Sequence, residues 1–229
     1  MDPVGLHKLC GEFSFVVADD HPSVSHAVSQ ICQSWLGVDA GRFVTAHCSH
    51  TLLEICSKPS PLPRIIVLDL VMPGELKRAA LVRAVRREDP QARVLVYSAD
   101  ESAFLAKSVM GAGANAYVSK SSPTSELVDA IVAVSEDRAH IDARIDFRTL
   151  RDSPWALLTE SERAVLLAFC RGDKPDVIMA NTGRSYSTVT THKYNGLKKI
   201  GLSDGNELLP YLYANGLICE LDDDGLRPE

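Results

Sequence analysis

Hydrophobic and polar residues follow two different patterns along the chain. Up to Ser135, short apolar runs alternate with longer segments in which apolar residues recur every three or four positions. The run at residues 64–68 is nearly continuous, as expected for a strand buried on both faces of a parallel sheet. From Trp155 onward only the helical spacing remains, so the sequence predicts two regions of different fold class.

Strand and helix patterns alternate five times in the first region. This alternation predicts an α/β fold with a doubly wound sheet of five parallel strands. We expect strands at residues 13–18, 42–48, 64–68, 93–97 and 116–118, and helices at residues 22–36, 49–57, 75–88, 102–110 and 123–135.

Chemically active side chains stand where these strands end. Asp19 and Asp20 follow the first strand, Asp69 the third, Ser98 the fourth and Lys120 the fifth. Because the carboxyl ends of parallel strands meet at one edge of a sheet, we expect these residues to line one crevice.

Three carboxylates in one crevice repel one another. Two like charges about 4 Å apart cost roughly 4 kcal/mol at an effective dielectric constant near 20. Such a group either raises its own pKa values or binds a cation, and oxygen ligands with room for water suit Mg²⁺. With the metal bound, Asp69 can stay ionised and attack a phosphoryl group.

The acid pair, the segment Asp-Leu-Val-Met-Pro-Gly at residues 69–74, Ser98 and Lys120 occur in the order of a known motif. Residues 13–137 resemble the flavodoxin-like receiver domain of bacterial two-component response regulators. The resemblance implies that Asp69 accepts phosphate from a sensor histidine kinase or phosphotransfer protein. It also assigns roles to the neighbouring residues: Mg²⁺ ligation to Asp19, Asp20, Asp69 and the Val71 carbonyl, phosphoryl stabilisation to Ser98 and Lys120, and a conformational switch to Tyr117.

Some features keep other interpretations open. The acids could merely cap helices in a flavodoxin-like sheet, and we interpret His21 as a solvated loop residue. An aspartate-nucleophile phosphatase would need a second acid two residues after the nucleophile, where this chain has Val71. Many receivers also place a proline directly after the lysine. Here two serines separate Lys120 from Pro123, which leaves a cis peptide bond in doubt.

The second region predicts a helix-turn-helix in a small all-α domain. Thr159 and Glu162 have the spacing of a capping box at the start of a first helix. Residues 175–181 form a short second helix, and Gly183 lies in the turn that follows. Ser185 or Ser187 can cap a third helix that runs to residue 199.

Charge on the third helix favours nucleic acid as a partner. The chain as a whole carries a net charge of −6, so any basic footprint must be local. Between Asp176 and Asp204 there is no acidic residue, whereas four basic residues occur there: Arg184, Lys193, Lys198 and Lys199. A basic stretch on a recognition helix is typical of DNA binding, although a merely solvated face is the alternative.

A second set of residues occurs at the spacings of a known family: Leu158, Thr159, Glu162, Val165, Leu166, Gly172, Ile178, Ser185, Thr188, Val189, His192, Asn195, Gly201 and Leu202. With these residues, the segment 158–202 resembles the tetrahelical DNA-binding domain of the NarL/LuxR type. The Arg184–Ser185 turn and residues 206–212 resemble its Rcs-type capsule-regulator branch. The resemblance implies that double-stranded DNA meets the third helix, with base edges contacted by Thr190, Thr191 and Tyr194, and phosphates by Ser187, Lys193 and Lys198.

Two positions depart from the pattern of this family. Thr190 replaces a common lysine, and Gly196 replaces a common aliphatic residue at a helix cost of roughly 1 kcal/mol. A fourth helix around residues 203–213 would form the dimer face, and Pro210 must kink it or delay its start to Asn206.

These patterns predict a receiver domain at residues 1–137, a linker at 138–154, a DNA-binding domain at 155–218 and an acidic tail at 219–229. Six cysteines lack the spacing of a metal site and are expected to be buried thiols. No apolar run approaches the ~20 residues of a membrane span. We therefore expect a cytoplasmic protein with no membrane partner.

The sequence thus predicts a transcriptional regulator that is controlled by phosphorylation and binds DNA as a homodimer when phosphorylated. It would accept and slowly lose a phosphoryl group without acting as a turnover enzyme. The alternative is a phosphorelay or interaction module that acts through a partner transcription factor.

Overall fold

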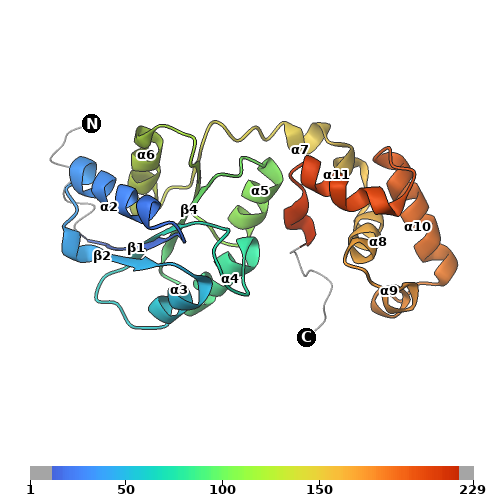
Figure 1. Cartoon of the computed structure of the whole chain (residues 1–229), viewed down its shortest axis with the longest axis horizontal. Helices are drawn as coiled ribbons and strands as arrows, with labels where there is room; N and C mark the ends of the chain where they lie inside the picture. The colour runs from blue at the N-terminus through green and yellow to red at the C-terminus, as the bar shows by residue number, and fades with distance from the viewer. Residues whose placement is uncertain (1–11, 222–229) are drawn as a thin grey trace. The chain divides into compact units, whose positions relative to one another are not determined.

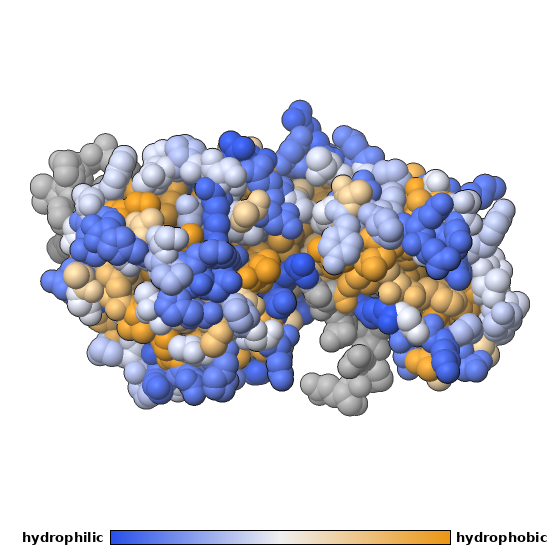
Figure 2. Space-filling model, viewed as in Figure 1, coloured by the Kyte–Doolittle hydropathy of each residue, from blue (hydrophilic) through white to orange (hydrophobic). Residues whose placement is uncertain are grey.

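The computed structural model describes residues 12–221. Contacts between its residues divide the chain into two compact units, one formed by residues up to 101 together with 105–145, and one formed by residues 102–104 and those from 146 onward. We describe each unit by itself. Hydrophilic residues lie over much of the visible surface of each unit, with hydrophobic residues showing between them (Figure 2).

The first unit is built on a parallel β-sheet. Within residues 12–221 the sheet has six strands in the order β2-β1-β3-β4-β5-β6, and every neighbouring pair is parallel. The doubly wound α/β prediction is confirmed, but the strand number of five is wrong. The strands are β1 (Ser14–Ala18), β2 (Phe43–Ala46), β3 (Arg64–Leu68), β4 (Arg93–Ser98), β5 (Ala116–Ser119) and β6 (His140–Ile141).

The sixth strand lies in the segment that we expected to be a linker. β6 pairs with β5 through Ala116 opposite His140 and Tyr117 opposite Ile141. Two residues are too few to produce a recognisable alternation of hydrophobic and polar positions. The sheet, and with it the first unit, therefore extends beyond residue 137.

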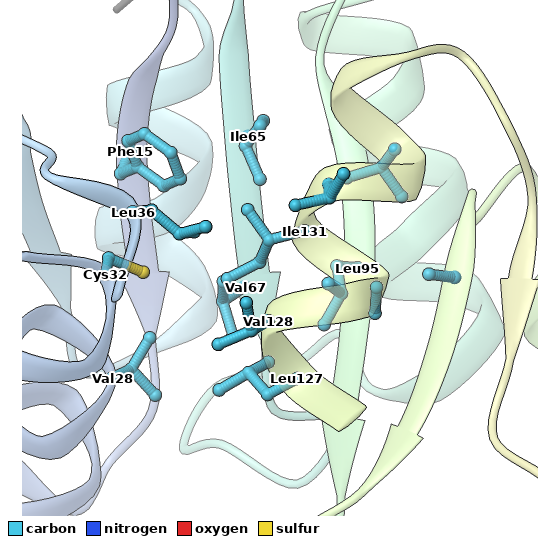
Figure 3. Packing of buried hydrophobic residues seen from close by; sticks show 14 of the residues in the cluster. Phe15, Val28, Cys32, Leu36, Ile65, Val67, Leu95, Leu127, Val128 and Ile131 are labelled. Carbon is cyan, nitrogen blue, oxygen red and sulfur yellow. The ribbon is translucent and has the colours of Figure 1, made fainter. Parts of the chain in front are cut away.

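Helices cover both faces of the sheet, as the doubly wound pattern predicts (Figure 1). On one face, α2 (Pro22–Leu36) and α6 (Thr124–Ser135) pack on alternate residues of the strands, among them Phe15, Ile65 and Leu95 (Figure 3). The remaining helices of the unit are α3 (Ser49–Cys56), α4 (Arg78–Glu88) and α5 (Ala103–Gly111). All five residues of β3 are buried, which explains its uninterrupted apolar sequence.

The loop after β3 is longer than the helical spacing predicted. Its helix, α4, begins at Arg78 and not at Glu75. Gly74 has a φ of 127°, and a Cβ atom there would lie 1.9 Å from Ser49 Oγ. This conformation and this close approach need glycine, so Gly74 is not helical, and α4 begins at Arg78 with a left-handed φ of 49°. All described peptide bonds are trans, including those between Lys120 and Pro123.

The second unit contains only helices and turns. Its helix-turn-helix is formed by α8 (Glu160–Cys170), α9 (Pro175–Thr182) and α10 (Tyr186–Lys199). The predicted capping box is present, since Thr159 accepts from the Glu162 backbone and Glu162 accepts from the Thr159 backbone. Gly183 adopts a left-handed φ of 64° in the turn, and Ser185 caps α10.

Other parts of this unit refine the expected boundaries. The short helix α7 (Thr149–Asp152) lies in the predicted linker. Helix α11 (Leu208–Ala214) follows a 3₁₀ turn at Gly205–Glu207, so Pro210 occupies the first helical turn, where its missing N–H costs nothing. Residues 219–221, which we assigned to the tail, belong to a 3₁₀ turn in which Cys219 is buried. The rest of the predicted tail lies outside the described residues.

The cysteines are largely as predicted. Cys32, Cys56 and Cys219 are buried thiols, and burial raises the pKa of Cys56 to about 12. Cys10 lies outside the described residues. Cys48 and Cys170 are partly exposed. No helix within residues 12–221 is both long enough and apolar enough to cross a membrane.

Close packing between α10 and α8 explains why a glycine occupies position 196, despite its low helix propensity. A Cβ atom at this position of α10 would lie 2.9 Å from Leu166 Cδ1 and 3.2 Å from its Cγ. Leu166 is fully buried in the core of the unit, so it has little room to move. The glycine therefore allows α10 to approach α8 closely.

We predict that Gly196→Ala lowers the free energy of unfolding of the second unit by about 1 kcal/mol, because overpacking outweighs the gain in helix propensity. Unfolding of the full chain can be followed by the fluorescence of the buried Trp155. The matched control is Gly111→Ala, at an exposed helical position where a Cβ meets nothing within 4 Å. This control should leave the Trp155 transition unchanged. A Gly196→Ala protein at least as stable as the wild type would contradict the explanation.

Candidate functional site

Two acidic residues are brought together by the pairing of β1 with β3. Ala18 is the register partner of Leu68, so the next residue on each strand, Asp19 and Asp69, leave the sheet side by side. The Asp69 backbone N–H donates to the Ala18 carbonyl over 2.8 Å, so the hydrogen bonds between β1 and β3 continue as far as the two acids. Both carboxylates are largely buried. The convergence predicted from the sequence is therefore present for this pair.

Lys120 extends from the end of β5 to both carboxylates. Its Nζ lies 2.6 Å from Asp19 Oδ2 and 2.8 Å from Asp69 Oδ2. Burial lowers the pKa of Lys120, but the hydrogen bonds and charges of the two carboxylates raise it further, so its pKa lies above the ordinary value. The ammonium group is thus charged at neutral pH and holds Asp19 and Asp69 together.

Asp20 and His21 complete the cluster. His21 Nδ1 lies 2.9 Å from Asp20 Oδ1 and 3.3 Å from Asp19 Oδ1. The imidazole is 67% exposed, in keeping with a loop histidine, but its contact with both acids was not predicted. Asp20 Oδ1 is nevertheless buried without a partner in hydrogen-bonding geometry. This oxygen is shielded from water and faces His21 without an aligned hydrogen bond, which is costly unless another ligand binds it.

These residues fit a divalent metal ion. Asp19, Asp20, His21 and Asp69 each offer a ligand atom, and these atoms all lie within 4.8 Å of one another. Three ionised carboxylates and one ammonium leave two negative charges, which one Mg²⁺ would neutralise. The Val71 side chain is exposed, and its backbone N–H donates to Asp69 Oδ1 over 3.2 Å. Ligation by the Val71 carbonyl stays a prediction.

Ser98 and Tyr117 meet at a residue that the sequence did not single out. Ser98 is buried at the end of β4, and its Oγ accepts from the Asp100 N–H over 3.1 Å. The Tyr117 ring is fully buried, and its hydroxyl donates to the Asp100 carbonyl over 2.5 Å. The backbone of Asp100 therefore binds both Ser98, the predicted phosphoryl-stabilising hydroxyl, and Tyr117, the predicted switch.

Other contacts of the site were also missed. The Tyr97 ring lies 6.0 Å from Lys120 Nζ, and burial raises the pKa of its hydroxyl. Asp142 binds residues on both sides of Lys120. Tyr97 could have been noticed because it precedes Ser98 on the same strand. Asp142 gave no such signal, because it follows a strand of two residues in an apparent linker.

The exposed face of α10 carries most of the predicted DNA contacts. Ser187, Thr191, Tyr194 and Lys198 follow one another at helical spacing and are exposed, and Thr190 is exposed beside them. Tyr186, which the sequence analysis did not select, is 60% exposed at the start of the helix.

The basic residues of this region are less available than their sequence suggested. Lys193 lies over the Phe169 ring at 4.1 Å, and Lys199 Nζ pairs with Glu162 over 2.7 Å. Arg184 donates to Ser161 Oγ over 2.5 Å. Lys198 is exposed and pairs with no acidic side chain among residues 12–221. The acid-free stretch therefore presents a smaller positive surface than the four charges alone would give.

The fold and the acid–lysine site together define a phosphoacceptor signalling domain joined to a helix-turn-helix unit. The model of the response regulator receiver domain matches residues 15–132, which is more than half of the chain. The chain belongs to the response regulator receiver family.

Similar proteins extend over nearly the whole chain. Transcriptional regulatory protein MctR of Rhizobium johnstonii is 28% identical over 212 residues, covering 90% of this chain and 95% of that protein. Response regulator UvrY of Escherichia coli K12 is 24% identical, covering 88% and 94%. The structure of RcsB from Salmonella enterica serovar Typhimurium, bound to a promoter in the presence of phosphomimetic BeF₃⁻, matches with a TM-score of 0.63 at 21% identity, covering 88% and 98%. This last likeness supports the two-part fold.

We predict that Lys120→Met increases the affinity for Mg²⁺ severalfold, because the ammonium competes with the metal for Asp19 and Asp69. Isothermal titration calorimetry of the unphosphorylated protein measures this directly. Lys107→Met, at an exposed position on α5, is the matched control and should leave the affinity unchanged. Weaker Mg²⁺ binding by Lys120→Met would show that the lysine supports the metal site and does not compete with it.

Proposed function

We propose that this protein is a phosphorylation-controlled transcriptional regulator of a bacterial two-component system, with Asp69 as the phosphoacceptor. The observation that carries the proposal is the pair of contacts from Lys120 Nζ to Asp19 and Asp69, next to a buried Asp20 oxygen that accepts no aligned hydrogen bond. This arrangement holds one nucleophile beside a fixed positive charge and leaves an oxygen set suited to a cation. A sensor histidine kinase or phosphotransfer protein is the proposed donor.

The transfer itself needs little covalent chemistry from the protein. An Asp69 carboxylate oxygen forms a bond to phosphorus while the phosphorus–nitrogen bond of the donor phosphohistidine breaks, and the imidazole leaves with the electron pair. Lys120 neutralises charge on the phosphoryl oxygens, and the Ser98 hydroxyl donates to one of them. Mg²⁺, when bound by the acidic residues, supplies further neutralisation of that charge. The protein gains and loses the group and does not act as a turnover enzyme.

The second unit is proposed to bind double-stranded DNA through α10. Supporting this, Ser187, Thr190, Thr191, Tyr194 and Lys198 form an exposed face rich in hydroxyl groups, with acid-free sequence around it. Lys193 would reach a phosphate only after leaving the Phe169 ring. MctR is named a transcriptional regulatory protein, and the RcsB structure has a promoter bound. Because one unit offers few available cations, we propose that a phosphorylated homodimer in the cytoplasm is the binding form.

The second candidate is an interaction module that acts through a partner transcription factor. The engagement of Arg184, Lys193 and Lys199 by the unit's own residues is the observation that favours it. The exposed Tyr186 and Tyr194 would suit a protein partner as well as DNA.

Control by phosphorylation predicts that BeF₃⁻ with Mg²⁺ raises the affinity for DNA in the wild type but not in Asp69→Asn. Fluorescence anisotropy with a pool of random-sequence duplexes measures the change. Asp129→Asn, at an exposed position on α6, is the matched control and should respond as the wild type does. An equal response of Asp69→Asn would remove Asp69 from its role, and absence of any DNA binding would favour the interaction module.

Direct DNA contact predicts that Lys198→Gln reduces the slope of log affinity against log salt by about 0.9 for each subunit bound, because one phosphate contact is lost. The neighbouring Lys199→Gln should change the slope little, since this lysine pairs with Glu162, and should instead lower the melting temperature. The salt titration distinguishes the two variants. Equal slopes for Lys198→Gln and wild type would place the DNA elsewhere.

A further inference from the structure

A buried acid lies just behind the site, in the segment that we expected to be a linker. Asp142 directly follows β6 and is 3% exposed. Its Oδ2 accepts from the Ser119 N–H over 3.0 Å and from the Ser122 hydroxyl over 2.5 Å. These two donors stand on either side of Lys120 in the sequence.

The two oxygens of Asp142 have different tasks. Oδ1 accepts from the Arg144 N–H over 2.9 Å, which is the ordinary hydrogen bond of an aspartate in its own turn. Oδ2 instead binds residues 23 and 20 positions earlier in the chain, at the end of β5 and in the loop after it. Burial raises the pKa of Asp142, but these hydrogen bonds lower it more, so its pKa lies below the ordinary value and the group is ionised at neutral pH.

A second chain of contacts joins the same segment to Ser98. Ser119 Oγ donates to Glu101 Oε1 over 2.7 Å, and Arg144 Nε donates to the same oxygen over 2.9 Å. Glu101 follows Asp100, the residue that contacts both Ser98 and Tyr117. The Asp142 N–H also donates to the Tyr117 carbonyl over 2.9 Å. Residues 140–145 thus bind the Lys120 loop and the Tyr117 backbone directly, and they reach the residues that follow Ser98 through Glu101.

We propose that Asp142 is a positioning residue for Lys120, and that residues 140–145 move with the Lys120 loop when Asp69 is phosphorylated. The inference rests on the proposed function. A buried carboxylate that loses its donors leaves unpaired charge, which is costly, so Asp142 follows Ser119 and Ser122 when their loop shifts. Ile145 is the last residue of the first unit before the chain enters the second. A shift of the Lys120 loop on phosphorylation of Asp69 is therefore transmitted to residues 140–145, which precede the second unit. The hydrogen bonds that transmit it all lie within the first unit.

The first test measures the rate of phosphorylation by acetyl phosphate in the full chain. Asp142→Asn replaces one acceptor oxygen by an amide, so it cannot serve both its own turn and the Lys120 loop. We expect the rate to fall about tenfold through misplacement of Lys120, with Mg²⁺ affinity within about twofold of the wild type. Asp146→Asn is the matched control, because exposed Asp146 makes the same local turn with the Arg148 N–H and contacts no residue of the loop. It should phosphorylate at the wild-type rate.

The second test asks whether residues 140–145 respond to the site. Hydrogen exchange of the wild type should change in this segment when BeF₃⁻ and Mg²⁺ are added. In Asp142→Asn that change should be lost, while the change near Asp69 remains. A residue with only a structural role would raise exchange with and without BeF₃⁻ alike. Ser122→Ala, which removes one donor and keeps the acid, should show a smaller loss in both tests if Asp142→Asn folds poorly.

The outcomes separate this inference from the proposed function. Two results would overturn the inference alone: wild-type rates in both Asp142→Asn and Ser122→Ala, or exchange at residues 140–145 that does not change with BeF₃⁻ in a wild type that does accept phosphate from acetyl phosphate. A wild type that neither takes phosphate nor binds BeF₃⁻ would overturn both.

Discussion

The contact of one ammonium group with two carboxylates is the constraint on which the site depends. Parallel pairing of β1 and β3 brings Asp19 and Asp69 together, and like charges this close repel. Lys120, from a strand two places further along the sheet, offsets one charge and leaves two. The remaining charge, with a buried Asp20 oxygen that accepts no aligned hydrogen bond, makes the site suited to a divalent cation and then to a phosphoryl group. Asp142 in turn restrains the position of Lys120, since it binds Ser119 and Ser122 on either side of that lysine.

The second unit shows how internal packing limits a binding surface. Gly196 brings α10 close to α8, where Lys199 pairs with Glu162 and Lys193 lies over Phe169. Charges used in this way contribute to the fold and less to a nucleic-acid footprint. The exposed face that remains is mainly hydroxyl and aromatic, with Lys198 at its end. Weak contacts of this kind gain from being doubled, which is why a dimer is central to the proposed DNA binding.

The sequence predicted the sheet and the residues at its carboxyl edge because both depend on strong local patterns. A continuous apolar run followed by Asp69 can be recognised without knowing what surrounds it. Features that depend on distant residues were harder to predict: β6 is too short to show a period, and α4 starts at Arg78, after a loop in which Gly74 packs against Ser49. Trp35 has the helical spacing of the buried residues of α2, yet it is 59% exposed. Spacing along the sequence does not show which part of a helix face other elements cover. Charge counting overestimated the basic surface because it ignored internal partners.

The central claim is that Asp69 is the phosphoacceptor within this charge-balanced cluster. It is tested most directly by treating the full chain with acetyl phosphate and Mg²⁺, reducing the acyl phosphate with borohydride, and locating the resulting homoserine by peptide mass spectrometry. Homoserine is expected at position 69 and at neither Asp19 nor Asp20. Homoserine at either of those residues, or a phosphoryl group found only on a histidine, would contradict it.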